Sequence, residues 1–337
     1  MRLGVSILLM FAGHVMSLAA GFTERNVVVA NDAAGITLAG TMTEPDGGDL
    51  RGAIVLATGS GAQDRDETIF GHKPFKAIAE HLSSNGYAVL RMDDRGVGES
   101  GGDFKTAVTD DFVSDISAGL QYLDSCYADL PKGVVGHSEG GTIAIKCAAG
   151  KKCDFIITLA APAWAGDSIV MSQSRALATA LTGKWDAESS QRQLLDIAKS
   201  QQPDFQSRIA LYAVMSQMVG EAAQLPAVKA QLSQQVGAML TPWYREMLRY
   251  DPADDISRVK VPWLALNGSL DCQVLPDNLN TISALNPDAD IKLLKGLNHL
   301  FQTCVTGLPQ EYPSLTESIS PVALSAITDW LLSFPRE

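Results

Sequence analysis

The chain has 337 residues, of which 46% are hydrophobic and 19% are charged, so it is long enough to bury a large core and is typical of a globular protein. One large domain with an insertion, or two domains, is the expected organisation. The net charge of −12, with no stretch rich in lysine or arginine, would repel nucleic-acid phosphates and argues against a nucleic-acid partner.

Residues 1–20 predict a secretory signal peptide. Arg2 precedes an apolar stretch from Leu3 to Leu18, and small residues follow at 19–21. The alternative is an uncleaved membrane anchor, but the apolar stretch is short for a span. We therefore expect a mature chain that starts near Gly21, is secreted or periplasmic, and has no stable membrane insertion after cleavage.

Strand and helix patterns alternate along most of the mature chain. Strand-like segments at 26–30 and 36–42 indicate an opening hairpin. Further strands are expected at 53–58, 87–92, 133–136, 155–159, 261–267 and 291–294. Helices are expected at 74–84, 110–124, 140–149 and 321–332. This alternation predicts an α/β fold with a mostly parallel central sheet flanked by helices on both faces.

The strand signal disappears between residues 162 and 250. This segment is rich in alanine, glutamine, serine, leucine and methionine at helix-compatible spacing. Its length favours an inserted helical cap over a long helical crossover. The predicted organisation is thus a signal peptide at 1–20, the first part of the core at 21–161, the cap at 162–250 and the second part of the core at 251–337.

The most informative motif is GVVGHSEGG at 133–141. It places G-x-S-x-G between an apolar strand and a helix-compatible segment, which is the setting of a strained strand-to-helix turn that exposes a serine hydroxyl. Glycines at 136 and 140 leave room for neighbouring elements to pack closely. Ser138 is therefore the predicted nucleophile, with a plain tight turn as the alternative.

A serine hydroxyl needs a base to activate it and an acid to orient that base. His299 follows the last strand and should lie at the carboxyl edge of the sheet, where it reaches Ser138. His72, in a loop that precedes the serine in the chain, remains an alternative. The other histidines are less suitable. His14 lies in the leader, the side chain of His137 is expected to point away from the site, and His81, within a helix, is expected on the surface.

Asp271 is the predicted orienting acid because it follows the strand VPWLALNG at the same edge of the sheet. Asp277, in a following helix, and Asp254, before the strand, are the alternatives. The resulting order of serine, aspartate and histidine is the chain order that this type of fold requires.

Acyl transfer also needs donors for the oxyanion of the tetrahedral intermediate. We predict the backbone amides of Glu139 and Ser60, with Gly61 as the alternative to Ser60. GSGAQD at 59–64 lacks the lysine of a phosphate-binding loop, and the histidines and cysteines form no metal-ligand pattern. No cofactor and no metal are expected.

Five cysteines lie in the mature chain. Cys272 directly follows the predicted acid and Cys304 lies five residues after the predicted base, so a disulfide between them would join two loops of the site. An oxidising compartment would permit such a bridge, although ordinary buried thiols are the alternative.

Together these motifs resemble those of the α/β-hydrolases, in particular esterase-like and serine-aminopeptidase-like hydrolases. The matching stretches are 57–67, 91–102, 136–141, 243–271 and 295–302. The resemblance implies an eight-stranded sheet, a helical cap after the sixth strand, and hydrolysis of small-molecule carboxylic esters through an acyl-enzyme on Ser138. Thr58 departs from the pattern, since many relatives carry histidine there.

Two other functions remain open at this point. The same three residues would also serve a peptidase, an amidase or an acyltransferase, because the pocket that discriminates between substrates lies in the predicted cap at 162–250. A non-catalytic interaction protein on a hydrolase scaffold would require a broken triad, whereas Ser138, Asp271 and His299 are all present.

Overall fold

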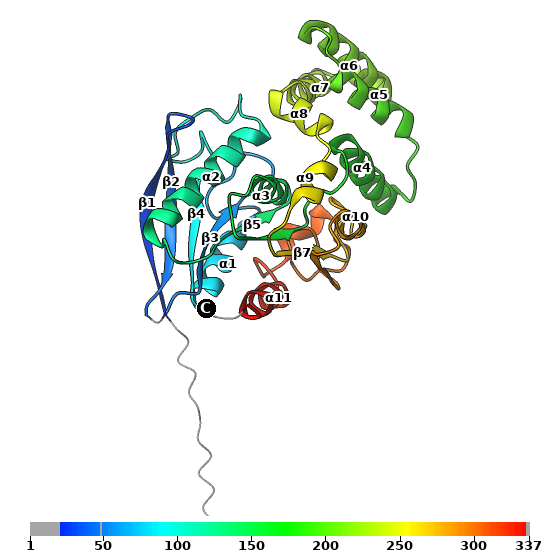
Figure 1. The fold of residues 1–337 in the computed structure, drawn as a ribbon. Helices are drawn as coiled ribbons and strands as arrows, with labels where there is room; N and C mark the ends of the chain where they lie inside the picture. Colours follow the sequence, from blue (N-terminus) through cyan, green and yellow to red (C-terminus); the bar gives the residue numbers. More distant parts are fainter. Residues whose placement is uncertain (1–20, 48, 335–337) are drawn as a thin grey trace, which may run out of the picture.

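A computed structural model describes residues 21–47 and 49–334, so the predicted signal peptide lies outside the described residues. An eight-stranded sheet with the order β1-β2-β4-β3-β5-β6-β7-β8 forms the centre of the molecule (Figure 1). Its strands are β1 (Phe22–Asn31), β2 (Ile36–Pro45), β3 (Gly52–Ala57), β4 (Tyr87–Met92), β5 (Lys132–His137), β6 (Phe155–Leu159), β7 (Trp263–Gly268) and β8 (Asp290–Leu294). β2 pairs antiparallel with β1 and β4, and all other pairs are parallel.

Six helices cover the two faces of this sheet. They are α1 (Pro74–Ser83), α2 (Thr109–Cys126), α3 (Glu139–Ala149), α9 (Ala253–Arg258), α10 (Asn278–Leu285) and α11 (Pro321–Leu332). Side chains on β3 alternate between the faces: Val55 joins a hydrophobic cluster with α2, α3, α9 and α10, and Ile54 joins another with α1 and α11. Burial on both faces explains why these strands are continuous apolar segments. The mostly parallel sheet with flanking helices is confirmed.

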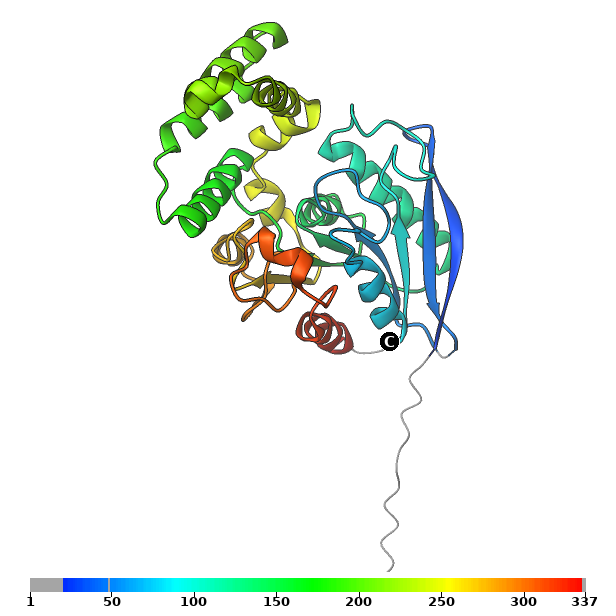
Figure 2. The same ribbon diagram turned by 180° about the vertical axis from the view of Figure 1, so that it is seen from behind.

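Between β6 and β7 the chain forms helices and no strand. These are α4 (Gly166–Thr182), α5 (Glu188–Lys199), α6 (Asp204–Val219), the 3-10 helix η1 (Gly220–Gln224), α7 (Pro226–Met239) and α8 (Pro242–Arg249). They enclose a third hydrophobic cluster, which includes Leu195, Leu211 and Val236. Figures 1 and 2 show α5 and α6 set apart from the sheet.

The opening hairpin is longer than the segments that the sequence predicts. β1 and β2 pair in continuous register from Phe22 opposite Pro45 to Asn31 opposite Ile36. The outer part of β1 is exposed and polar, so it carries no apolar pattern, and only the cross-strand hydrogen bonds define it. No helix in the described part of the chain is long and apolar enough to cross a membrane.

Candidate active site

Ser138 lies in the turn between β5 and α3. Its backbone has φ 53° and ψ −117°, a conformation that residues other than glycine rarely adopt. The turn holds because glycines surround it: a β-carbon at Gly136 would lie 2.0 Å from the Gly140 carbonyl oxygen, and one at Gly140 would lie 1.9 Å from that of Ala57. Close packing at both predicted glycines therefore holds the half-buried serine in this turn.

Asp271 and His299 meet at the carboxyl edge of the sheet, in the loops after β7 and β8. Nδ1 of His299 lies 2.8 Å from Oδ2 of Asp271, and both side chains are buried. The other oxygen of Asp271, Oδ1, accepts backbone hydrogen bonds from Gln273 at 2.8 Å and Val274 at 3.0 Å. The carboxylate therefore fixes the ring with Nδ1 protonated, which leaves Nε2 free to accept a proton.

Ser138 and His299 line the same cavity, which has a volume of about 390 Å³. Within the described residues, the hydroxyl of Ser138 makes no hydrogen bond with the His299 ring. A base and its nucleophile often come within bonding distance only when substrate binds. The structure thus brings the three predicted residues to one site.

The alternatives to these residues lie elsewhere or are engaged. Nε2 of His72 lies 3.0 Å from the backbone oxygen of Tyr312. Asp277 precedes the first residue of α10, and Asp254 lies in α9. His81, which we expected on the surface, is partly buried, and its Nε2 lies 2.7 Å from Oγ1 of Thr328.

The two predicted oxyanion donors border the same cavity. Glu139 is the first residue of α3, so its amide is one of those that a helix leaves without an internal acceptor. Ser60 follows Gly59, where a β-carbon would lie 3.3 Å from Cβ of Ser138. The loop after β3 therefore passes directly beside the serine.

Asp94 holds this loop in place. Its Oδ1 accepts from the Thr58 hydroxyl at 2.7 Å, and its Oδ2 accepts from the Gln63 amide at 2.9 Å. Thr58 thus braces the loop through its hydroxyl group. Burial raises the pKa of Asp94 to about 7.

Two arginines support the loops on either side of the cavity: Arg65, which is partly buried, and Arg95, which is buried. Arg65 pairs with Asp93 at 2.7 Å, while Arg95 binds Asp111 at 2.7 Å and Asp115 at 2.8 Å. These contacts tie the loop after β4 to the loop after β3 and to α2.

The cavity is lined mainly by apolar and aromatic side chains from the sheet edge and from α4 and α8. The contributions of α4 and α8 include Ile169, Val170, Trp243, Tyr244 and Met247. None of its described lining residues is a lysine or an arginine. Such a lining suits an apolar, uncharged group better than an anion.

The side chain of Glu139 joins α8 to the turn at Ser138. Its Oε1 accepts from Nε1 of Trp243 at 2.7 Å and from the Thr109 hydroxyl at 2.9 Å. Burial raises the pKa of Glu139. Trp243 lies on α8, so this contact fixes one wall of the cavity relative to Ser138.

Sequence reasoning missed two buried residues beside the serine, Glu67 and His137. We expected the His137 side chain to point away from the site, but its ring lies 4.8 Å from the ring of His299, centroid to centroid. Oε1 of Glu67 lies 2.9 Å from Nδ1 of His137. A glutamate within a polar loop carries no signal of this contact, because the two residues are 70 positions apart.

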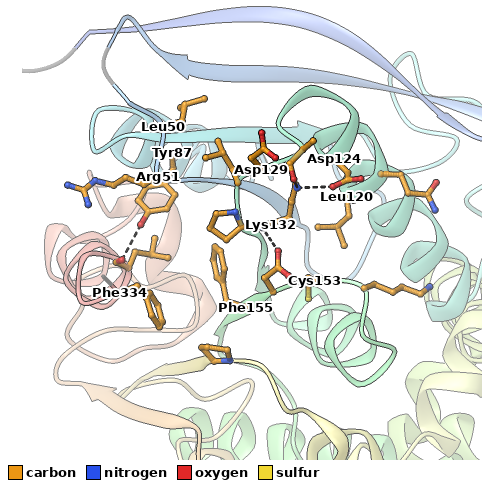
Figure 3. Close-up of a pocket in the computed structure, with 18 of the residues that line it drawn as sticks. Leu50, Arg51, Tyr87, Leu120, Asp124, Asp129, Lys132, Cys153, Phe155 and Phe334 are labelled. Carbon is orange, nitrogen blue, oxygen red and sulfur yellow. Dashed lines mark hydrogen bonds and ion pairs between the residues drawn. The ribbon is translucent and has the colours of Figure 1, made fainter. Parts of the chain in front are cut away.

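A larger hollow of about 1190 Å³ lies at the other edge of the sheet, where the parallel strands begin (Figure 3). Tyr87, Lys132 and Phe155, which line it, belong to the starts of β4, β5 and β6. Nζ of Lys132 is already paired with Asp124 at 2.7 Å. Because ligands of open α/β sheets bind at the carboxyl ends of the strands, we place the site at the smaller cavity.

Cys272 and Cys304 are free thiols in this structure. The Cys272 thiol donates to the Gly307 oxygen at 3.0 Å, and that of Cys304 donates to the Gly296 oxygen at 3.6 Å. The bridge between them is therefore not formed here, and it stays a prediction for the oxidised protein. Across residues 21–47 and 49–334, no cluster of three or more histidine, cysteine or acidic side chains could hold a metal ion.

Comparison with known proteins places this geometry in a family. The family model described as serine aminopeptidase, S33, matches residues 72–302. Esterase EstD of Thermotoga maritima is 26% identical over 282 residues, which make up 83% of this chain and 60% of that protein. The chain thus matches less than two thirds of the length of this relative.

Solved structures resemble the chain over nearly its whole length. The esterase Pf2001 of Pyrococcus furiosus gives a TM-score of 0.58 at 16% identity, covering 93% of this chain and 92% of that one. A thermophilic esterase of Thermogutta terrifontis gives 0.53 at 19% identity, covering 91% and 98%. The family match and these structures confirm the predicted α/β-hydrolase fold.

Proposed function

The chain belongs to the serine aminopeptidase S33 family, and we propose that it hydrolyses carboxylic esters of small molecules through an acyl-enzyme on Ser138. One observation carries this proposal: a serine on a strained turn shares a cavity with a histidine whose Nδ1 is held by a buried aspartate at 2.8 Å. The esterase names of the relatives above support an ester as the substrate.

The reaction follows from the positions of these groups. Oγ of Ser138 attacks the ester carbonyl carbon while Nε2 of His299 takes the hydroxyl proton, and Asp271 stabilises the imidazolium that forms. The amides of Ser60 and Glu139 bind the oxyanion. His299 then protonates the leaving alcohol, activates a water that attacks the acyl-enzyme, and returns the proton to Ser138 as the acid leaves.

Residues 162–250 are proposed as the cap that selects the substrate. Their helices have a hydrophobic cluster of their own and supply Trp243, Tyr244 and Met247 to the cavity. A cavity of about 390 Å³ with few charges favours an uncharged acyl group of short to medium length.

A peptidase is the second candidate, and the family description is the observation that favours it. Peptide cleavage uses the same nucleophile, base and oxyanion donors, so the triad does not separate the two functions. An amidase or an acyltransferase would use them as well. The leaving group and the final acceptor distinguish these reactions.

The test is to label the purified protein with a fluorophosphonate and to assay p-nitrophenyl esters of increasing acyl length beside aminoacyl p-nitroanilides. We expect labelling, and faster turnover of the esters. Ser138→Ala should abolish both, whereas Ser257→Ala, on the exposed surface of α9, should change neither. A folded wild-type protein that neither labels nor cleaves an ester would refute the proposal, and preferential anilide cleavage would favour the peptidase.

We also propose that the protein is exported and is secreted or periplasmic. The support is the arrangement of Arg2, the apolar stretch at 3–18 and the small residues before Gly21. Sequencing the N-terminus of protein recovered outside the cytoplasm should find a start near Gly21. Full-length protein retained in the cytoplasm would contradict this.

A further inference from the structure

A carboxylate and an imidazole meet directly behind the nucleophile. The Glu67 side chain comes from the loop before α1, and His137 is the last residue of β5. They are 4% and 6% exposed, and Oε1 of Glu67 lies 2.9 Å from Nδ1 of His137. The reaction proposed above uses neither side chain.

Both ring nitrogens of His137 face groups that only accept hydrogen bonds. Nδ1 faces Oε1 of Glu67, an oxygen that already accepts from the Gly59 amide at 2.6 Å. Nε2 faces the backbone oxygen of His299 at 3.0 Å. A neutral imidazole carries only one N–H, so one of its nitrogens would direct a lone pair at an oxygen. When Glu67 is a carboxylate, the two contacts are satisfied together only by the doubly protonated ring.

The surrounding charges favour the same protonation state. Burial alone lowers the pKa of His137, but the Glu67 carboxylate, the hydrogen bonds to Glu67 and His299, and the more distant Asp271 outweigh it, so the net direction is upward. The titratable groups around the His137 ring are thus the carboxylates of Glu67 and Asp271 and the imidazole of His299.

The backbone around Glu67 is arranged to deliver its carboxylate to this point. Glu67 has φ 51°, in the left-handed region, and its amide donates to the Asp64 oxygen at 2.9 Å. A β-carbon at Gly59 would lie 2.9 Å from Oε1 of Glu67 and 3.4 Å from Nδ1 of His137. Only glycine leaves space for the carboxylate, so the loop after β3 closes onto this pair.

We propose that Glu67 and His137 form a permanent buried ion pair that positions the oxyanion loop and the His299 loop around Ser138. The carboxylate holds the amide next to Ser60, and the imidazolium holds the backbone oxygen of the proposed base. Both are positioning residues, since neither touches the reacting atoms. The ion pair itself does not depend on the proposed ester hydrolysis; only its expected effect on the reaction rate rests on that function.

The ion pair also acts on His299 through its charge. The ring of His137 lies 4.8 Å from that of His299, centroid to centroid, so its positive charge is close to the ring that takes the proton from Ser138. Asp271 compensates the positive charge that His299 then acquires.

The direct test is NMR of protein with ¹⁵N-labelled histidine, which needs no substrate. In the wild type, both ring nitrogens of His137 should still carry protons at a pH above the ordinary pKa of an imidazole, where a free imidazole has lost one of them. In Glu67→Gln the ring should carry only one proton under the same conditions, because the carboxylate no longer offsets the effect of burial. A wild-type His137 with a single ring proton at about pH 8 would overturn the ion pair.

The kinetic test compares Glu67→Gln with Glu44→Gln, which removes a carboxylate that binds Arg25 and Tyr127 far from the cavity. Glu67→Gln should lower kcat on the order of 10²-fold with little change in KM, because misplaced loops act on the transition state. Glu44→Gln should leave kcat and the His137 signals unchanged. A kcat for Glu67→Gln within threefold of the wild type would contradict the positioning role.

These two readouts separate this proposal from the esterase proposal. If no ester is turned over, the histidine spectrum still decides whether the ion pair exists, and the rate of fluorophosphonate labelling replaces kcat. If Glu67→Gln fails to fold, the wild-type spectrum alone remains decisive.

Discussion

Backbone strain gathers around Ser138. Two residues that line the cavity, Glu67 and Ser138, have φ of 51° and 53° although neither is glycine. Each lies in a loop at the carboxyl edge of the sheet, and each such conformation costs on the order of 1–3 kcal/mol. Strain of this kind persists only where the surroundings fix the chain, and here close-packed glycines and buried hydrogen bonds do so.

At the residue scale, the role of Asp271 is the sharpest prediction. Asp271→Asn keeps the size and the backbone contacts of the side chain but removes the charge that holds His299 with Nδ1 protonated. We expect kcat for p-nitrophenyl esters to fall on the order of 10⁴-fold. Asp277→Asn, at the start of α10, should retain wild-type kcat. Equal activity of the two variants would exclude Asp271 as the orienting acid.

The sequence predicted those site residues whose position follows from chain topology. Ser138, Asp271 and His299 each follow a parallel strand, and the ends of parallel strands meet at one edge. Glu67 and His137 were missed because their contact depends on a left-handed backbone at Glu67, and nothing in the neighbouring sequence specifies that conformation.

At the element scale, β5 and α3 pack closely because the glycines at their contact, Gly136 and Gly140, have no side chain. Gly140→Ala would place a β-carbon 1.9 Å from a backbone oxygen that belongs to β3, and backbone cannot move aside cheaply. We expect a loss of at least about 1–3 kcal/mol in the free energy of unfolding, measured with urea.

Gly237→Ala is the matched control, because nothing lies within 4 Å of its β-carbon and the residue is inside α7. Alanine is the better helix former, so this variant should gain about 0.5–1 kcal/mol. If both substitutions change the free energy of unfolding equally, close packing at Gly140 is not the reason why only glycine is tolerated there.

Element boundaries were predictable where burial alone defines them. β4 and β6 match the predicted segments at 87–92 and 155–159 because both are fully buried apolar strands. β1 and α2 extend beyond their predicted ranges, since hydrogen bonding continues into exposed residues such as Thr23 and Cys126. The arrangement of the helices between β6 and β7 was beyond prediction, because many packings satisfy the same helical pattern.

At the scale of the whole molecule, Asp94 makes folding stability depend on pH. Its pKa rises from 3.8 to about 7 in the folded protein, so the folded state binds a proton that the unfolded state has already released over this interval. Stability should therefore fall as the pH increases from about 4 to about 7. The contribution is at most about 4 kcal/mol.

Asp94→Asn tests this dependence because asparagine does not titrate. The wild type should lose more free energy of unfolding than the variant between about pH 4 and about pH 8, as measured by urea denaturation at both values. Parallel losses in the two proteins would show that Asp94 is ionised in the folded state throughout.

In the part of the chain that the structure describes, the hydrophobic cluster of α4–α8 shares no residue with the two clusters that pack on the sheet. Val170, Tyr244 and Met247, which line the cavity, pack against this cluster, whereas Trp243 packs against a cluster of the sheet and binds Glu139 beside Ser138. Substitutions within the cluster of α4–α8 can therefore reshape part of the cavity wall without replacing any residue of the two clusters that support the sheet.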